Sequence, residues 1–382
     1  MAADRNWLDL RRYLAREPVI LALLSIAAVI LFLAVTGLSR AYHAQRESLG
    51  NRWFSRGVAD LNARHYDSAI TEFRAALLYS RDSYAYQLNL AEALLGLKRT
   101  SEASAYLLNL WDREPENGLV NLELARIAAQ RGQNEQALRY YHNAIYATWP
   151  GDQTVERRDT RVELIEYLLK INATAQAQSE LIALEANLGD DPTQQLRVGD
   201  LFLQARDYQN ALAAYRLSLK GDRHSQAAMA GAGSAAFDLG LYPEAQRYLQ
   251  EAVAAAPGDA QSSDRLKTTE LVLRMDPFRR QISSAQRDRT VIGAFDAAGE
   301  RIKSCALPKG AVTPPAWEQD LAGRWAKMKP EMTERGLRRN PDLVEDAMDL
   351  VFSIERQTSA TCGAPTGPDL ALLLIAKLHE GN

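Results

Sequence analysis

Cysteine is nearly absent from this chain, since Cys305 and Cys362 are the only two among 382 residues. Neither belongs to a CxxC or CxxCH motif, and no paired Cys/His spacing of the zinc-site kind occurs. The sequence therefore gives no support to a thiolate metal site. Two thiols confined to the C-terminal part suggest a disulfide between Cys305 and Cys362, as in an oxidising compartment; two unpaired thiols are the alternative.

The chain also lacks an excess of charge of either sign. Its 45 Lys and Arg residues nearly balance 48 Asp and Glu residues, which leaves a net charge of −3. Nucleic-acid-binding proteins usually concentrate basic residues in one patch, and no such patch occurs here. We therefore expect no nucleic acid partner. A hydrophobic content of 47% allows a substantial core and argues against general disorder.

Recognisable catalytic motifs are missing as well. The five histidines are scattered, and HExxH, GxSxG and P-loop patterns do not occur. No serine or cysteine has a candidate base close to it in the sequence. The sequence thus predicts no catalytic residue, no cofactor, no metal ligand and no small-molecule substrate.

What the chain does contain is one long uncharged run, at residues 18–38. At about 1.5 Å per residue a helix of this length spans roughly 30 Å, the thickness of a bilayer core. Trp7, Tyr13 and Tyr42 flank it, as interfacial anchors do. A cleavable signal peptide is the alternative, but its apolar run is shorter and no small-x-small site follows Thr36. We predict a tail at 1–17, a transmembrane helix at 18–38 and a juxtamembrane helix at 39–50.

The orientation of this span is nearly balanced by charge. Arginines flank it in equal number, at Arg5, Arg11, Arg12 and Arg16 before it and at Arg40, Arg46, Arg52 and Arg56 after it. The short tail, with its basic residues close to the span, favours an N-inside topology. The expected location of the remaining chain is then a bacterial periplasm, with a cytosol-facing body as the alternative.

After the span an alanine recurs every 34 residues, with one interval of 40. The series is Ala69, Ala103, Ala137, Ala177, Ala211 and Ala245. Self-similarity at this period predicts stacked helix pairs, each burying an apolar face against the next. Such a stack is usually a surface that holds another protein.

The first unit carries a more specific pattern. It contains Trp53, Gly57, Tyr66, Ala69, Phe73 and Ala76, and its YDSAI segment begins at Tyr66. These spacings resemble the tetratricopeptide repeat, and the resemblance covers about residues 51–260. It implies an all-α fold with a right-handed α-solenoid of about six helix pairs at 51–276, including a capping helix at 259–275. In each pair the small residues mark where two antiparallel helices touch.

Unit four departs from the pattern. Ile165 occupies a position that is small elsewhere, and the interval of 40 places extra residues around 149–160. Because this stretch, WPGDQTVERRDT, contains proline, glycine and many charges, we predict an extended loop there. A separate sequence, GAGSAA at 231–236, is superficially similar to a dinucleotide fingerprint. Its glycines fall inside a predicted first helix without a preceding strand, so we interpret them as packing positions.

The C-terminal module, residues 277–382, resembles no family that we can name. Its pattern predicts a long amphipathic helix from Pro277 to Cys305 and a loop containing Pro308, Pro314 and Pro315. Helices are then expected near 316–328, from Asn340 as N-cap, and at 368–379. We expect this module to cover the end of the solenoid, because an uncovered terminal helix would expose apolar surface. Partner binding is the alternative.

One face of that module is acidic, with Asp342, Glu345, Asp346 and Asp349 on one side of a predicted helix. Such a face is usually solvated, and early acids are favoured by the helix dipole. An enzyme or metal site in the C-terminal module is kept only as an alternative to the main prediction.

The resemblance also implies a partner groove lined by the first helix of each pair. The candidate groove residues are Phe54, Val58, Leu88, Glu92, Leu122, Arg126, Gln130, Glu166, Lys170, Asp200, Gln204 and Asp238. Chaperone-binding members of the family clamp a carboxylate with basic residues and Asn, but of Phe54, Val58, Asn89, Leu119 and Glu123 at the matching positions only Asn89 fits. A basic or amphipathic partner segment, peptide or helix, is the better prediction.

Together these features predict a non-enzymatic scaffold or adaptor, anchored in a membrane by one helix. It would bind a protein partner in the groove and act in envelope assembly or protein handling.

Overall fold

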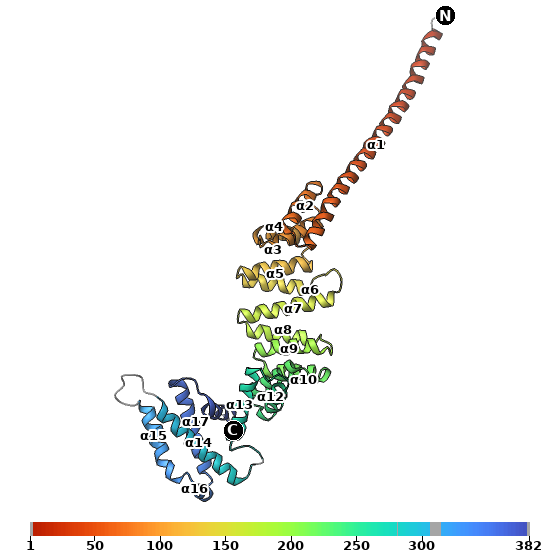
Figure 1. The fold of residues 1–382 in the computed structure, drawn as a ribbon. Helices are drawn as coiled ribbons and strands as arrows, with labels where there is room; N and C mark the ends of the chain where they lie inside the picture. Colours follow the sequence, from red (N-terminus) through yellow and green to blue (C-terminus); the bar gives the residue numbers. More distant parts are fainter. Residues whose placement is uncertain (1–2, 281, 306–314, 380–382) are drawn as a thin grey trace. The chain divides into compact units, whose positions relative to one another are not determined.

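The computed structural model describes residues 3–280, 282–305 and 315–379, with side chains from Ile20 onward. Within these residues the chain forms eighteen α-helices and one 3-10 turn, and no strand (Figure 1). The prediction of an all-α fold is confirmed. The chain divides into two compact units, Met1–Leu164 and Ile165–Asn382, which we describe one at a time.

Six helix pairs follow one another along the chain, as the alanine series predicts. The first three are α1 Ala3–Asn62 with α2 Tyr66–Tyr79, α3 Tyr84–Gly96 with α4 Thr100–Arg113, and α5 Gly118–Gln130 with α6 Asn134–Tyr146. The others are α7 Gln153–Lys170 with α8 Thr174–Glu185, α9 Pro192–Gln204 with α10 Tyr208–Gly221, and α11 Gln226–Asp238 with α12 Tyr242–Ala255. We call α1, α3, α5, α7, α9 and α11 the first helices.

The repeating small residues lie where the helices of a pair touch. All six alanines of the series are fully buried. A Cβ built on Gly57 would come within 2.6 Å of the Phe73 ring, and one on Gly199 within 2.8 Å of Tyr215. A larger residue would push the helices apart, so the small residue on one helix and the large residue on its partner form one packing unit.

The glycines of GAGSAA are also positions where a small residue allows close packing of helices. Gly231 and Gly233 lie within α11, and added Cβ atoms would meet Tyr215 at 2.3 Å and Leu249 at 2.7 Å. Gly231→Ala should therefore lower the free energy of unfolding of its unit by about 1–3 kcal/mol through overpacking. Gly258→Ala, where nothing lies within 4 Å, is the matched control. Equal midpoints for the two variants in urea denaturation would contradict the packing interpretation.

The turn inside every pair uses one repeated backbone conformation. Positive φ angles occur at Arg64, Lys98, Gly132, Asn172, Arg206 and Gly240. These positions keep the 34-residue period, with the same single interval of 40. Each first helix is followed by a residue in the left-handed backbone conformation, which is common at helix C-termini. Four of the six are not glycine, so side-chain type alone does not reveal this turn in the sequence.

The prediction of an extended loop at 149–160 is wrong for the residues after Asp152. Helix α7 begins at Gln153 and has 18 residues, against 13 in α3, α5, α9 and α11. The Asp152 carboxylate accepts a hydrogen bond from the Thr154 N–H at 3.0 Å and so supports the first turn. Most of the extra residues thus lengthen the helix.

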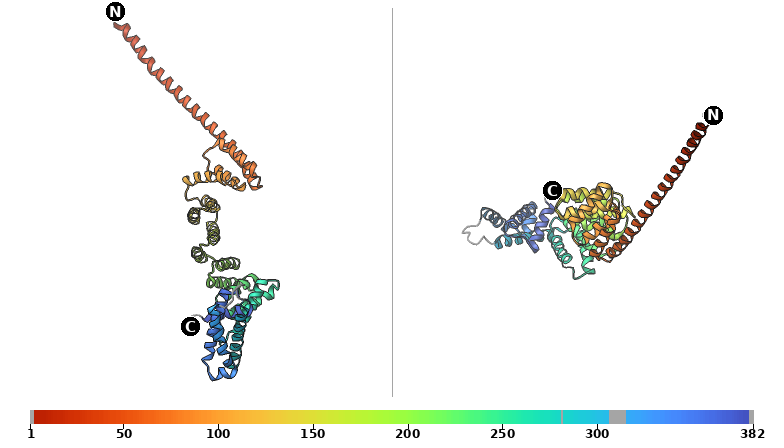
Figure 2. Two further views of the ribbon diagram at one scale, coloured as in Figure 1. Left: turned by 90° about the vertical axis from the view of Figure 1, so that its left-hand side faces the viewer. Right: turned by 90° about the horizontal axis from the view of Figure 1, so that it is seen from above.

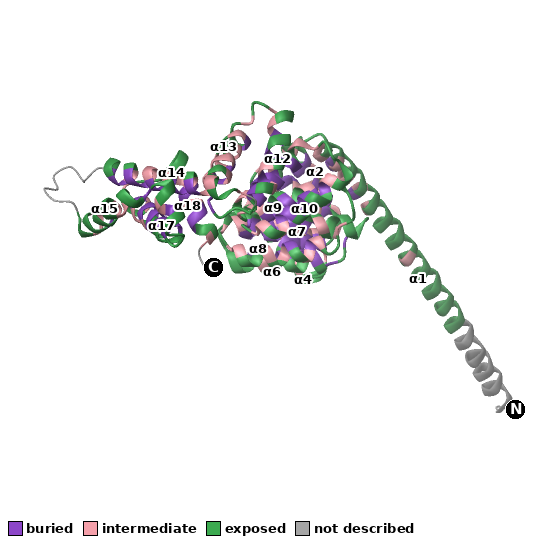
Figure 3. Ribbon diagram, turned by 90° about the horizontal axis from the view of Figure 1, so that it is seen from below, coloured by how far each residue is buried: buried purple, intermediate pink, exposed green. Residues whose placement is uncertain are grey.

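The longest helix is α1, which runs without a break from Ala3 to Asn62 (Figure 2). Within the described residues it is the one helix that is long and apolar enough to cross a membrane, by length and composition. Signal sequences pass the same test. Its apolar residues from Ile20 to Leu38 are exposed (Figure 3), in contrast to the buried faces of the helix pairs.

The second unit continues beyond the repeats with further helices. They are α13 Ala260–Met275, α14 Ser284–Ser304, α15 Ala316–Met328, the 3-10 turn Lys329–Glu331, α16 Glu334–Arg339, α17 Leu343–Thr361 and α18 Gly367–His379. Their buried side chains form one cluster that also includes Tyr242 of the last repeat and Val272 of α13. His379 of α18 lies 3.3 Å from the Asp276 carboxylate. The module therefore covers the end of the repeats, as predicted.

Two helix starts in this module differ from the prediction. The long helix begins at Ser284 and not at Pro277, because the Ser283 hydroxyl caps it by accepting from the Gln286 N–H at 3.2 Å. Asn340 is not an N-cap: it ends α16, and α17 begins at Leu343 after Asp342. Pro308 and Pro314 of the predicted loop lie outside the described residues.

Cys305 and Cys362 are joined in a disulfide, and their Cα atoms are 5.5 Å apart. That separation is ordinary for such a bond. The bond ties the end of α14 to the end of α17.

Candidate functional site

The candidate site is the face formed by the first helices, beginning with an aromatic contact. Phe54 of α1 stacks on Tyr86 of α3 with ring centroids 4.9 Å apart, and it also contacts the ring of Phe73. The Tyr86 hydroxyl donates to the Asn51 side-chain oxygen at 2.7 Å. Phe54 and Val58 are only half buried. They therefore join the first two pairs and still offer apolar surface.

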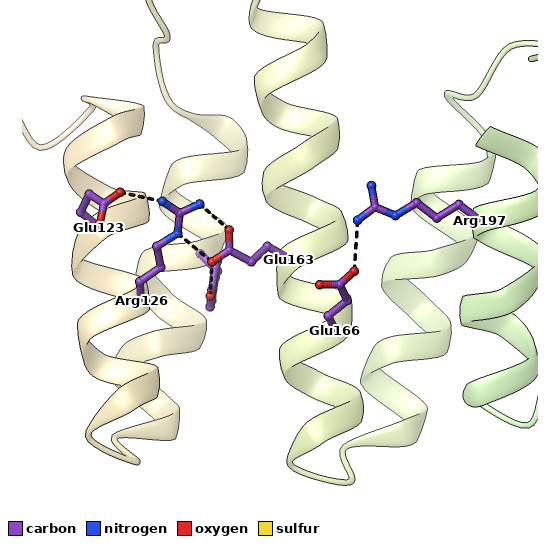
Figure 4. A network of polar contacts seen from close by, with 6 residues as sticks. Glu123, Arg126, Glu163, Glu166 and Arg197 are labelled. Atoms are coloured by element: carbon purple, nitrogen blue, oxygen red, sulfur yellow. Dashed lines mark hydrogen bonds and ion pairs between the residues drawn. The ribbon is translucent and has the colours of Figure 1, made fainter. Parts of the chain in front are cut away.

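A charged network occupies the same face farther along unit 1 (Figure 4). Arg126 of α5 donates to Glu123 at 2.6 Å and, through two nitrogens, to Glu163 of α7 at 2.7 and 2.8 Å. The Tyr141 hydroxyl of α6 donates to Glu163 at 2.9 Å. The bidentate pair fixes α5 and α7 in register at this point.

Burial and charge shift the pKa values of this network. Hydrogen bonding to Glu163 is the main cause that raises the pKa of the Arg126 guanidinium, which therefore stays charged. Desolvation raises the pKa of Glu123 above its ordinary value, although Arg126 opposes the shift. The raised pKa of Glu123 means that the single guanidinium of Arg126 does not fully offset the free-energy cost of burying this carboxylate.

Glu92 of α3 adds a further carboxylate to this face. Desolvation raises its pKa, and the nearby charge of Glu123 raises it further. Among the described residues Glu92 makes no hydrogen bond or ion pair. Three carboxylates, at Glu92, Glu123 and Glu163, thus lie in this region, and its one guanidinium, Arg126, pairs with Glu123 and Glu163 only. This part of the face of unit 1 therefore carries an excess of negative charge. We call these four residues the acidic network.

In unit 2 the face of the first helices has a different character. Glu166 of α7 pairs with Arg197 of α9 at 3.1 Å (Figure 4). A cavity of about 740 Å³ is lined by Glu166, Leu169, Lys170, Asn172, Thr174, Gln204 and Arg206. Lys170 and Arg206 make no ion pair among the described residues. This part of the face is therefore open, polar and partly cationic.

Two other predicted groove residues have partners of their own. Asp200 accepts a hydrogen bond from the Tyr215 hydroxyl at 2.7 Å, and desolvation raises the pKa of both groups. Asp238 pairs with Arg265 of α13 at 3.1 Å. Both carboxylates therefore help to hold neighbouring helices together.

The predicted groove residues fall into three groups. Leu122 is only 7% exposed, so it packs in the interior and offers little surface. Phe54, Val58, Leu88, Glu92 and Arg126 are half buried, whereas Gln130, Glu166, Lys170, Asp200, Gln204 and Asp238 are exposed. The structure brings Glu92 close to Glu123, which pairs with Arg126, and it brings Glu166 close to Lys170 and Gln204.

Two members of the acidic network, Glu123 and Glu163, are missing from the sequence prediction. Glu163 was missed because its role comes from pairing with Arg126 of another helix, 37 positions away, which leaves no local signal in the sequence. Glu123 was considered only as a poor match to a carboxylate clamp. A count of acidic residues on the first helices would have shown both.

The C-terminal module contains an unusual buried acid. Glu355 of α17 is 0% exposed, and neither carboxylate oxygen has a hydrogen-bond partner. Desolvation, with a contribution from the charge of Asp369, raises its pKa to about 8 against the opposing effect of Arg301. Asp342, Glu345, Asp346 and Asp349 are exposed, and no group of metal-ligating side chains gathers within the described part of the chain.

Comparison with known proteins gives a family match for two segments. The family model described as tetratricopeptide repeat matches residues 54–110 and 196–260. No curated protein matches the chain.

Solved structures match at low sequence identity. Pseudomonas aeruginosa pilF is 18% identical over 57% of this chain and 97% of its own, with a TM-score of 0.41. The C-terminal part of a repeat protein from Cytophaga hutchinsonii is 15% identical over 62% and 92%, with a TM-score of 0.46. The TPR2AB domain of yeast Sti1, in a complex with pHSP90, is 17% identical over 78% and 98%, with a TM-score of 0.30. The chain contains tetratricopeptide repeats, as the spacing of its alanines and aromatic residues predicts.

Proposed function

We propose that this protein is a non-enzymatic, membrane-anchored scaffold or adaptor that binds a segment of a partner protein on the face of its first helices. The observation that carries the proposal is Glu92, a partly desolvated carboxylate without a partner beside Glu123. A lysine or arginine of a bound segment would supply the missing positive charge. Phe54 and Val58 would contact apolar side chains of the same segment. A basic amphipathic segment is therefore the partner chemistry that this face fits.

Site-specific photo-cross-linking in cells tests this proposal. A photoreactive phenylalanine analogue at Gln130, which is exposed on α5, should give a discrete protein adduct. The same analogue at Glu135, exposed on α6, is the control. Equal adduct patterns at both positions, or none at Gln130, would contradict binding on this face. Variants at Leu122 or Arg126 are unsuitable, because burial and ion pairing make both structural.

We further propose that the apolar part of α1 spans a membrane, with the repeats in the periplasm, in envelope assembly or protein handling. The exposed run Ile20–Leu38 and the disulfide support this placement. A membrane-impermeant maleimide, applied to intact cells with a permeabilised outer membrane, should label Cys305 and Cys362 only after reduction. Labelling that requires lysis of the inner membrane would contradict the periplasmic placement and favour a cytosol-facing docking receptor.

A further inference from the structure

A groove in the C-terminal module lies among helices α13, α14 and α18, all of which belong to the second unit. Its volume is about 580 Å³, within the roughly 300–1,000 Å³ that is usual for ligand sites. Its apolar lining includes Met275 of α13, Ala294 and Ala297 of α14, and Pro368 of α18. The groove is therefore large enough, and apolar enough, to receive aliphatic side chains.

Gly293 of α14 keeps this groove open. It lines the groove and is exposed, and a Cβ built on it would meet nothing within 4 Å. At Gly299 on the same helix, by contrast, a Cβ would come within 2.4 Å of the Trp325 ring. Within the described residues, no side chain of this protein fills the space beside Gly293.

Two arginines line the groove, and neither has an acidic partner among the described residues. Arg274 lies in the last turn of α13 and is exposed; Glu270, one turn before it, forms no ion pair with it in this part of the chain. Arg289 of α14 is also exposed, and its guanidinium donates to a neutral group, the Ala285 carbonyl, at 3.2 Å. Two positive charges therefore remain uncompensated beside the apolar lining.

The acids of the same stretch do not offset these charges. Residues 274–289 contain five arginines and two acids, Asp276 and Asp288. Asp276 is 7% exposed and lies 3.3 Å from His379, and Asp288 is 2% exposed and lies 3.9 Å from each of two arginines. The exposed charges of this stretch are therefore positive, although the whole chain carries a net charge of −3.

We infer that this groove binds an acidic amphipathic segment of a partner protein. An aliphatic side chain of the segment would fill the space beside Gly293, and its carboxylates would pair with Arg274 and Arg289. Because Gly293 and both arginines are exposed, the groove is open, and a segment of chain fits it better than a small ligand, most of whose surface a site must bury. A nucleic acid fits less well, because no aromatic side chain lines the groove to stack on a base.

This site is independent of the face of the first helices that we propose for a basic segment. It lies on other helices and carries the opposite charge. With both sites the protein would hold two partner segments of opposite charge, as an adaptor does.

Binding of a designed peptide to the full chain tests the inference. The chain is held in phosphatidylcholine nanodiscs, with empty nanodiscs as the blank, and affinity is measured by fluorescence anisotropy. The probe is a labelled helical peptide with leucines on one face and glutamates beside them, and a second peptide carries glutamine in place of every glutamate. We expect the glutamate peptide to bind more tightly, by about tenfold or more, because it alone pairs with the arginines.

Two substitutions test the groove itself. Gly293→Leu fills it from within and Arg289→Glu reverses one charge, so each should weaken binding of the glutamate peptide by about tenfold or more. Gly323→Leu and Arg335→Glu are the matched controls, since Gly323 of α15 has nothing within 4 Å and Arg335 is exposed on α16. Leucine favours a helix more than glycine does, so folding should be preserved, which circular dichroism checks.

Three results would overturn the inference. The first is equal affinity for the two peptides, or equal affinity in Gly293→Leu and Gly323→Leu. The second is a loss in Arg289→Glu alone, which would mean charge attraction without use of the groove. The third is binding of a single-stranded oligonucleotide that Gly293→Leu weakens to the same extent, which would assign the groove to nucleic acid.

Discussion

At pH 8 the Glu355→Gln protein should have a C-terminal module more stable than that of the unmodified chain by about 4 kcal/mol. The folded state raises the pKa of Glu355 to about 8, whereas the unfolded chain has the ordinary value near 4.5. Below pH 4.5 both states are protonated, and the folded state carries no penalty. Between pH 4.5 and 8 only the folded state keeps the proton, so stability falls by up to about 1.4 kcal/mol per pH unit.

Hydrogen exchange of the α17 amides at pH 5 and pH 8, corrected for intrinsic exchange rates, measures this difference. Glutamine is neutral throughout and nearly the same shape, so most of the pH dependence should disappear in Glu355→Gln. The pKa of Asp369 is also raised, so the variant should keep a smaller dependence of stability on pH. Glu345→Gln, exposed on the same helix, is the control. An unchanged pH slope in Glu355→Gln would show that Glu355 is not buried as described.

Arg126→Ala should lower the free energy of unfolding of the first unit by about 2–3 kcal/mol at pH 7. Removing a fully buried partner costs about 3–5 kcal/mol, and the 41% exposure of the Arg126 side chain reduces that cost. The substitution leaves Glu123 and Glu163 without their guanidinium. Since Arg126 lowers the pKa of Glu123, its loss raises that pKa further.

The sign of the pH dependence identifies this mechanism. A carboxyl group whose pKa is raised in the folded state carries no free-energy penalty when the pH is below its pKa in the unfolded chain. As the pH rises above that pKa, the folded state becomes progressively less stable. The deficit of Arg126→Ala should therefore shrink between pH 7 and pH 5 in urea denaturation. Arg99→Ala is the control, because its exposed pair with Glu102 should contribute less than about 1 kcal/mol. A deficit that is the same at both pH values would argue for lost packing instead.

The fold could be predicted from the sequence because its main determinants are local and periodic. Buried alanines such as Ala69 and small–large pairs such as Gly57 and Phe73 recur at the helix-pair period. The start of α7 was mispredicted because Pro150 and Gly151 suggested a loop, whereas the Asp152 side chain supports a helix directly after them. Asn340 was mispredicted because a good N-cap residue can equally end a helix.

The candidate site was less predictable, because its chemistry depends on contacts across helices. Glu163 meets Arg126 although 37 positions separate them. The burial of Glu355 and the packing of Leu122 depend in the same way on which face each helix presents. The periodicity of the sequence predicts well where each helix lies. It predicts poorly which side chains pair across helices and which are buried away from water.

The central claim is that the acidic network of the first unit attracts a positively charged partner segment. Its most direct test is the adduct yield from the photoreactive residue at Gln130 in two backgrounds, Glu92→Lys and Glu135→Lys. Both substitutions change the charge by the same amount, but only Glu92 belongs to the network. The account predicts that Glu92→Lys abolishes most of the adduct while Glu135→Lys preserves it. Equal yields in the two backgrounds would contradict it.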